Sequence, residues 1–209
     1  MIAIVPKIAT KTVMPEQSFR DLAALVMSRE PRFGRTRLIA VDGPSGAGKT
    51  RFADGLAAAL GCPVVHTDDL LNGWDDQFTF WTRLEEKVLT PLRAGETATY
   101  QPYNWVKGDF SGTPVTVPAA QAVLLEGVSA ARRAIRPELT LAVFVDAPAG
   151  LRWERAITRD GDDSLAYRKY LGRWRAAEER HFAMDETATH ADLVVDGAAR
   201  AAEGNFSKG

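Results

Sequence analysis

The stretch that decides the fold is Gly43-Pro44-Ser45-Gly46-Ala47-Gly48-Lys49-Thr50, in which every position matches the phosphate-loop pattern G-x-x-x-x-G-K-[ST]. Glycines let the backbone curl so tightly that successive N–H groups point into one hollow of anion size. In this pattern the lysine, Lys49, reaches the β- and γ-phosphates, and the hydroxyl of Thr50 ligates Mg²⁺. The stretch therefore predicts a nucleoside triphosphate site, with the residues from Gly43 to Thr50 around the phosphates.

The residues on either side of this loop have the patterns of a strand and a helix. Residues 38–41 (LIAV) enter the loop as a buried strand would, and residues 50–60 leave it with the apolar spacing of an amphipathic helix that Gly61 ends. This order is the context that the pattern requires. The N-terminus of the helix adds its positive dipole end to the anion site.

The composition limits the classes of protein that fit. The chain has 209 residues, of which 45% are hydrophobic and 25% charged, and this suits one α/β domain. Its net charge of −1 excludes a protein that coats nucleic acid, because no excess of positive charge is present to follow a phosphate backbone. No apolar run reaches the roughly 18 residues of a membrane span. The lone cysteine, Cys62, fits a reducing compartment. We expect a soluble cytoplasmic protein that binds a small molecule and neither nucleic acid nor membrane.

Strand and helix patterns alternate along the chain, which predicts an α/β fold with a five-stranded parallel sheet and helices on both faces. Residues 96–117 read instead as an extended hairpin, residues 1–36 as an N-terminal extension with one helix, residues 37–197 as the main domain, and residues 198–209 as a flexible tail. Besides residues 38–41, strands are expected at residues 63–65, 122–125, 141–145 and 193–195, and helices at residues 17–29, 50–60, 78–92, 130–135, 149–159 and 164–183.

Acidic residues follow most of the predicted strands, at the sheet edge where open parallel sheets bind ligands. Asp68 and Glu126 are the favoured functional candidates, as a proton acceptor and an Mg²⁺ ligand. Asp42 adjoins the phosphate loop and is expected to brace it. Asp146 and Asp196 precede turn residues, so helix capping or turn formation explains them.

Three arginines, Arg152, Arg155 and Arg159, have the spacing of one helix face. A solvated basic face is one interpretation. A lid at about residues 152–182, with arginines that cover a transferring phosphoryl group, is the interpretation that the phosphate loop favours.

With these motifs in order, the chain resembles the uridine kinase family of P-loop nucleoside kinases, which is itself similar to nicotinamide riboside kinase and pantothenate kinase. The resemblance is carried by residues 64–71 (VVHTDDLL), 103–105 (YNW), 124–127 (LLEG), the arginine helix and residues 191–195 (ADLVV). It implies a P-loop kinase fold with a helical lid, and it implies ATP and Mg²⁺ as cofactors. Asp68 would take the proton of the acceptor hydroxyl, and Thr50 and Glu126 would hold the metal. By the same resemblance, Lys49, Asp68, Arg155 and Arg159 are catalytic, Arg155 also contacts ATP, and the acceptor contacts Asp68, Arg159, Tyr103, Asn104 and Trp105.

Asn104 stands where that family usually carries an aspartate that grips sugar hydroxyls, and a neutral amide makes weaker hydrogen bonds than a carboxylate. The expected reaction is transfer of the γ-phosphoryl of ATP to a hydroxyl, with a nucleoside such as uridine or cytidine as the leading acceptor. A nucleoside monophosphate, a vitamin precursor and a sugar stay open, as do a non-catalytic nucleotide-binding regulator and a homo-oligomer. The aromatic residues Trp74, Tyr100, Tyr103 and Trp105 are candidates to stack on a planar acceptor.

Overall fold

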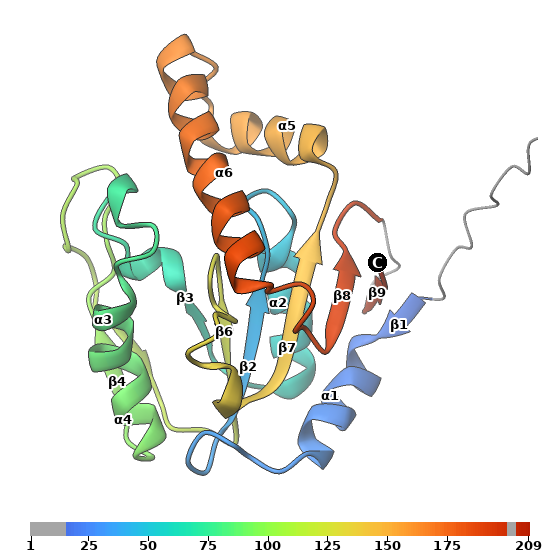
Figure 1. Ribbon diagram of the computed structural model, residues 1–209. Helices are drawn as coiled ribbons and strands as arrows, with labels where there is room; N and C mark the ends of the chain where they lie inside the picture. Colours follow the sequence, from blue (N-terminus) through green and yellow to red (C-terminus); the bar gives the residue numbers. More distant parts are fainter. Residues whose placement is uncertain (1–15, 200–203) are drawn as a thin grey trace, which may run out of the picture.

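A five-stranded sheet, in which all neighbouring strands are parallel, forms the centre of the computed structural model, which describes residues 16–199 and 204–209 (Figure 1). The strand order is β3-β6-β2-β7-β8. This confirms the predicted sheet and all five of its expected strands. Their bounds are Arg37–Asp42 (β2), Val64–His66 (β3), Ala122–Glu126 (β6), Leu139–Asp146 (β7) and Leu193–Asp196 (β8).

Each face of the sheet has its own hydrophobic core, because successive strand residues point to opposite sides. Ile39 and Val41 pack with α1 (Phe19–Ser28) and α2 (Lys49–Leu60). On the other face, Leu38 and Ala40 belong to a core that includes the helical segments at residues 81–93. The strands are therefore apolar on both faces, as their continuous hydrophobic runs indicate.

The helix predicted at residues 78–92 forms as three consecutive segments, with a π-helical turn in the middle. These are α3 (Trp81–Leu84), η3 (Glu85–Leu89) and α4 (Thr90–Arg93). An antiparallel hairpin of β4 (Ala98–Tyr100) and β5 (Val115–Val117) follows, so the expected hairpin is also confirmed. Short 3₁₀ turns lie at Thr67–Leu70 (η1), Trp74–Asp76 (η2) and Arg136–Glu138 (η4).

Two helices, α5 (Ala149–Asp160) and α6 (Leu165–Asp185), form an arm that extends beyond the carboxyl ends of the strands (Figure 1). Gly161, with φ of 65°, ends α5. The hydroxyl of Ser164 caps α6 by accepting a hydrogen bond from the backbone N–H of Tyr167 at 3.2 Å. No helix in the described part of the chain is long and apolar enough to cross a membrane.

The helix expected at residues 130–135 is wrong, because this segment consists of turns. The backbone N–H groups of Ser129 and Ala131 donate to the carboxylate of Asp42, at 2.9 Å each, instead of to helix carbonyls. Ser129 also has a φ of +69°, which an α-helix cannot contain.

The tail expected at residues 198–209 also differs from the structure. Asn205–Ser207 forms a strand, β9, which pairs antiparallel with β1 (Glu16–Ser18). Phe206 is 3% exposed and packs edge-on or tilted against Phe19 and Phe52, at centroid distances of 5.2 and 5.1 Å. The sequence prediction missed the burial of Phe206 because its neighbours in the sequence are small and polar. Residues 1–15 of the expected N-terminal extension and residues 200–203 of the expected tail lie outside the described residues.

We expect Phe206→Ala to lower the free energy of unfolding by about 3–5 kcal/mol, because it leaves a cavity between Phe19 and Phe52. Urea unfolding followed by circular dichroism measures the change. Met184→Ala is the control, since that side chain is 80% exposed and its loss should cost less than about 0.5 kcal/mol. Equal effects of the two substitutions would show that β9 does not contribute to the core.

Candidate functional site

The phosphate loop between β2 and α2 is shaped by glycines that no other residue can replace without strain. Gly43, Gly46 and Gly48 have positive φ angles of 138°, 78° and 102°. A Cβ atom on Gly43 would lie 2.1 Å from the carbonyl oxygen of Val145, and one on Gly46 would lie 2.5 Å from that of Arg152. The loop is therefore fixed both by its backbone conformation and by its close approach to β7 and α5.

Lys49 lies inside this loop, and its surroundings form a polar recess of about 270 Å³. Lys49 is only 8% exposed, and its ammonium group donates a hydrogen bond to the carbonyl oxygen of Pro44 at 3.2 Å. Thr50 is exposed at the start of α2. We call this recess the phosphate pocket; it is lined by Ser45, Gly46, Gly48, Lys49, Thr50, Asp68, Glu126, Val128, Arg155, Ala156 and Arg159.

Asp42 is the buried brace of the loop, as its position in the sequence predicts. Its carboxylate accepts hydrogen bonds from the backbone N–H groups of Gly43 at 2.7 Å and of Ser129 and Ala131. Burial raises the pKa of Asp42 to about 6, although these three hydrogen bonds and the charge of Lys49 oppose the shift. One side chain thus joins the phosphate loop to the loop that follows β6.

Asp68 and Asp69 occupy different environments although they are adjacent in η1. The carboxylate of Asp68 is accessible from the phosphate pocket, but the surrounding walls desolvate it and raise its pKa, against the opposing charge of Lys49. Asp69 accepts a hydrogen bond from the hydroxyl of the buried Tyr100 at 3.1 Å. Only Asp68 of the two lines the phosphate pocket.

Glu126 lies at the end of β6 and is 6% exposed. It lines the phosphate pocket together with Thr50. Its Oε2 lies 2.7 Å from Nδ1 of His66, and this contact raises the pKa of the histidine. Among the residues that the structure describes, no three His, Cys, Asp or Glu side chains form a metal-holding group. Glu126 and Thr50 fit an Mg²⁺ ion only if phosphate oxygens supply further ligands, which is how phosphate-bound Mg²⁺ is usually held.

The three arginines of α5 have three different roles. Arg152 is buried, and its Nε donates to the carbonyl oxygen of Ala147 at 2.9 Å. Arg155 donates to the carbonyl oxygens of Gly46 at 3.1 Å and of Gly197 at 3.0 Å, so it ties the phosphate loop to the turn after β8. Arg159 is exposed and forms an ion pair with Asp160. Arg155 and Arg159 line the phosphate pocket and Arg152 does not.

A second recess of about 440 Å³ adjoins the phosphate pocket and shares Ser45, Asp68 and Arg159 with it. Trp74 is central to its wall, with Trp105 at 4.9 Å and Trp174 at 5.5 Å between ring centroids, both edge to face. Its size is that of a small-molecule site. We call it the aromatic pocket; it is lined by Ser45, Asp68, Leu71, Trp74, Trp105, Arg159, Asp160, Leu171 and Trp174.

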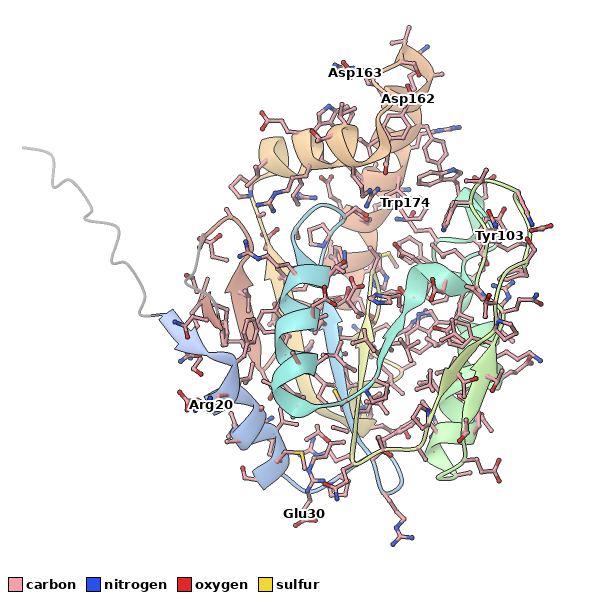
Figure 2. All side chains as sticks on the ribbon, turned by 180° about the vertical axis from the view of Figure 1, so that it is seen from behind. Arg20, Glu30, Tyr103, Asp162, Asp163 and Trp174 are labelled. Atoms are coloured by element: carbon pink, nitrogen blue, oxygen red, sulfur yellow. The ribbon has the colours of Figure 1, made fainter. Side chains whose placement is uncertain are left out.

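Two of the predicted substrate contacts do not line either pocket. The side-chain oxygen of Asn104 accepts hydrogen bonds from the backbone N–H groups of Val106 and Lys107 at 3.0 Å each, so it stabilises its own turn. Tyr103 packs on Trp105 and on Phe110, at 5.1 and 5.3 Å between centroids. In Figure 2 it lies in the hairpin loop, apart from Trp174. Trp105 alone of residues 103–105 lines the aromatic pocket.

Sequence reasoning missed the contribution of α6 to this pocket. Leu171, Trp174 and Glu178 are its buried residues, and they follow each other at spacings of three and four. This spacing is the signal that could have identified the buried face. This signal is weak because the third residue of the pattern is a glutamate, a residue type that is seldom fully buried.

The comparisons with known proteins show the fold. No protein-family model matches the chain, and no curated protein matches it. A possible uridine kinase from Bacillus stearothermophilus superposes with a TM-score of 0.62 at 20% identity, over 84% of this chain and 96% of that one. A protein from Silicibacter sp. that is named a putative fructose transport system kinase has a TM-score of 0.62 at 20% identity, over 85% of this chain and 98% of that one. D-glycerate 3-kinase from Cryptococcus neoformans has a TM-score of 0.52 at 13% identity, over 90% and 98%. The chain has the P-loop kinase fold.

Asp42 generates a prediction about pH. Its folded-state pKa of about 6 lies above its ordinary value of 3.8, so between these values the unfolded chain loses a proton that the folded protein keeps. The free energy of unfolding of the parent, relative to that of Asp42→Asn, should therefore fall by about 2 kcal/mol as the pH rises from about 4 to 6. Urea titrations of both proteins across this range measure it. Parallel curves would contradict the raised pKa.

Proposed function

We propose that the protein is an ATP- and Mg²⁺-dependent kinase that transfers the γ-phosphoryl group to a hydroxyl of a small molecule. The observation that carries this proposal is the pair of adjoining pockets, which share Ser45, Asp68 and Arg159 at their boundary. One pocket has the glycine loop and lysine that suit a triphosphate. The other has the size and the aromatic walls that suit an organic acceptor. A carboxylate and a cation at the boundary are the groups that phosphoryl transfer requires.

The donor side of the reaction falls to residues of the phosphate pocket. Backbone N–H groups of the phosphate loop bind the phosphates, apart from those of Gly43 and Ser45, which donate to Asp42 and Glu178, and Lys49 neutralises the phosphate charge. Thr50 and Glu126 hold Mg²⁺, which when bound offsets the negative charge of the phosphates. Arg155 fixes the loop through its carbonyl contacts and lies close enough to meet the nucleotide.

Asp68 acts as the general base on the acceptor side. It is accessible from both pockets, so a hydroxyl held in the aromatic pocket can place its proton on this carboxylate. Desolvation by the pocket walls raises its pKa, which makes it a stronger proton acceptor than an aspartate with the ordinary pKa. The resemblance to nucleoside kinases assigns the same role to this position.

Arg159 covers the transferring group from the arm. Its ion pair with Asp160 leaves it at the shared boundary, and the charge of Asp68 acts on it there. An arginine in this place stabilises the charge that spreads over the phosphoryl oxygens. Closure of the arm would also exclude water from the reacting groups.

A nucleoside such as uridine or cytidine remains the leading acceptor, since the aromatic pocket offers Trp74, Trp105 and Trp174 to a planar base. The names of the neighbouring structures agree with a sugar, which is already a candidate, and add a hydroxy acid. Because Asn104 is committed to its own turn, hydroxyl groups of a sugar must find other partners. Measuring ATP consumption with nucleosides, nucleoside monophosphates, sugars and vitamin precursors tests the proposal. Nucleotide binding without consumption for any acceptor would favour a regulatory protein instead.

We expect Lys49→Ala to weaken the binding of Mg·ATP at least tenfold and to abolish phosphoryl transfer, because it removes the charge-assisted contacts to the phosphates. Isothermal titration calorimetry measures the affinity. Lys87→Ala is the control, since Lys87 is exposed on η3 and lines neither pocket. The same affinity in both variants would place the nucleotide elsewhere.

Asp68→Asn should lower the turnover number by about 10²- to 10⁴-fold, the usual contribution of a positioned base. Its affinity for ATP should not weaken, because the substitution removes a negative charge beside the phosphates. Steady-state kinetics with the best acceptor from the screen measures the turnover. Asp69→Asn is the matched variant, and a larger loss there would move the base by one residue.

A further inference from the structure

A buried carboxylate on α6 holds one end of the phosphate loop. Glu178 is 1% exposed, and its Oε1 and Oε2 accept the backbone N–H of Ser45 at 3.1 and 3.3 Å. The hydroxyl of Ser45 also donates to Oε1. Among the residues that the structure describes, Glu178 forms no ion pair. Its hydrogen bonds thus come from the phosphate loop and from one tryptophan.

That tryptophan, Trp174, connects the same carboxylate to the aromatic pocket. Its Nε1 donates to Oε1 of Glu178 at 2.8 Å and to Oγ of Ser45 at 3.1 Å. Its ring lines the aromatic pocket and packs edge-on against Trp74. Figure 2 shows Trp174 at the level where the arm meets the body of the protein, far from Asp162 and Asp163 at the tip of the arm.

Ser45 is the residue of the phosphate loop that lies at the boundary of the two pockets, together with Asp68 and Arg159. It lines both pockets, whereas Gly48, Lys49 and Thr50 line the phosphate pocket only. With the donor in the phosphate pocket and the acceptor in the aromatic pocket, as proposed, the γ-phosphate lies at the shared boundary beside Ser45. An acceptor in the aromatic pocket is bordered by this same residue.

We propose that Glu178 is a positioning residue for Ser45. Together with Trp174 it fixes Ser45, and this keeps a bound γ-phosphate aligned with the acceptor pocket. This inference rests on the proposed function, because it assigns the two pockets to donor and acceptor. Glu178 touches neither pocket and moves no proton. It acts by accepting three hydrogen bonds that converge on its Oε1, which keeps the Ser45 end of the loop from rotating away.

The convergence on one oxygen separates position from charge. The side-chain carbonyl of a glutamine can replace Oε1 and accept its three hydrogen bonds without the negative charge. Alanine instead leaves the N–H and the hydroxyl of Ser45 without this acceptor and leaves Nε1 of Trp174 with Oγ of Ser45 alone. A loss in Glu178→Ala that Glu178→Gln restores would therefore show that the hydrogen bonds hold the loop.

The experiment compares the binding of Mg·ADP and of a non-hydrolysable ATP analogue by calorimetry. In Glu178→Ala we expect the analogue to bind about tenfold more weakly and ADP to bind within about twofold of the parent. Glu178→Gln should restore both affinities to within about twofold. Glu179→Ala is the matched control, because Glu179 is the adjacent and exposed residue of α6.

Trp174→Phe keeps an aromatic ring at this position but removes the N–H donor together with part of the indole, so it provides a second test if Glu178→Ala fails to fold. It should weaken the analogue about threefold relative to ADP. Equal losses for ADP and the analogue would show general damage to the loop and overturn the inference, as would a Glu178→Ala variant that matches Glu179→Ala. An unchanged ratio in Trp174→Phe would overturn it too. Failure of the parent to bind either nucleotide would instead overturn the proposed function.

Discussion

The site depends on the convergence of three backbone N–H groups on the buried carboxylate of Asp42. Two of these groups belong to the loop after β6, and the third begins the phosphate loop. An unpaired carboxylate at this depth would be expensive to bury, so its hydrogen bonds must all be made together. This requirement fixes the positive φ of Ser129 and the turns that follow it. The phosphate loop, which leads into Lys49, and the loop that follows Glu126 therefore cannot move independently.

The remaining functional groups are brought in by elements that pack over the same edge of the sheet. η1 supplies Asp68, α5 supplies Arg155 and Arg159, and α6 supplies Trp174. Polar contacts to backbone atoms set these elements against the phosphate loop, as with Arg155 and the carbonyl oxygen of Gly46. The loop consequently receives an arginine on its carbonyl groups and a carboxylate on the N–H of Ser45. In each contact, the side chain carries the charge opposite to the partial charge of the backbone group that it meets.

The parts predicted from the sequence were those with a local pattern. The five strands, the hairpin and α2 follow from apolar periodicity and glycine positions, and these features depend on neighbours within one element. The site residues on the phosphate loop were placed by a motif, and the structure brings Lys49, Asp68, Glu126, Arg155 and Arg159 to one pocket.

The failures of prediction involve partners that are distant in the sequence. The alanine-rich segment after Ser129 has helical propensity, but its N–H groups are taken by Asp42. Asn104 matches a substrate-binding position, but its amide oxygen is occupied by its own turn. Glu178 has the sequence character of a surface residue, and only the fold places it beside Ser45.

The pairing of β1 with β9 has a consequence for the order of events during synthesis. Glu16 and Ser207 are neighbours in this ribbon although almost the whole chain separates them. Contacts between such distant residues form slowly because a long loop must close first. The ring surfaces of Phe19 and Phe52 that Phe206 covers therefore stay exposed to water until the end of the chain has been made and has folded back. A chain in which this ribbon has not yet formed therefore exposes apolar surface that favours association with other chains.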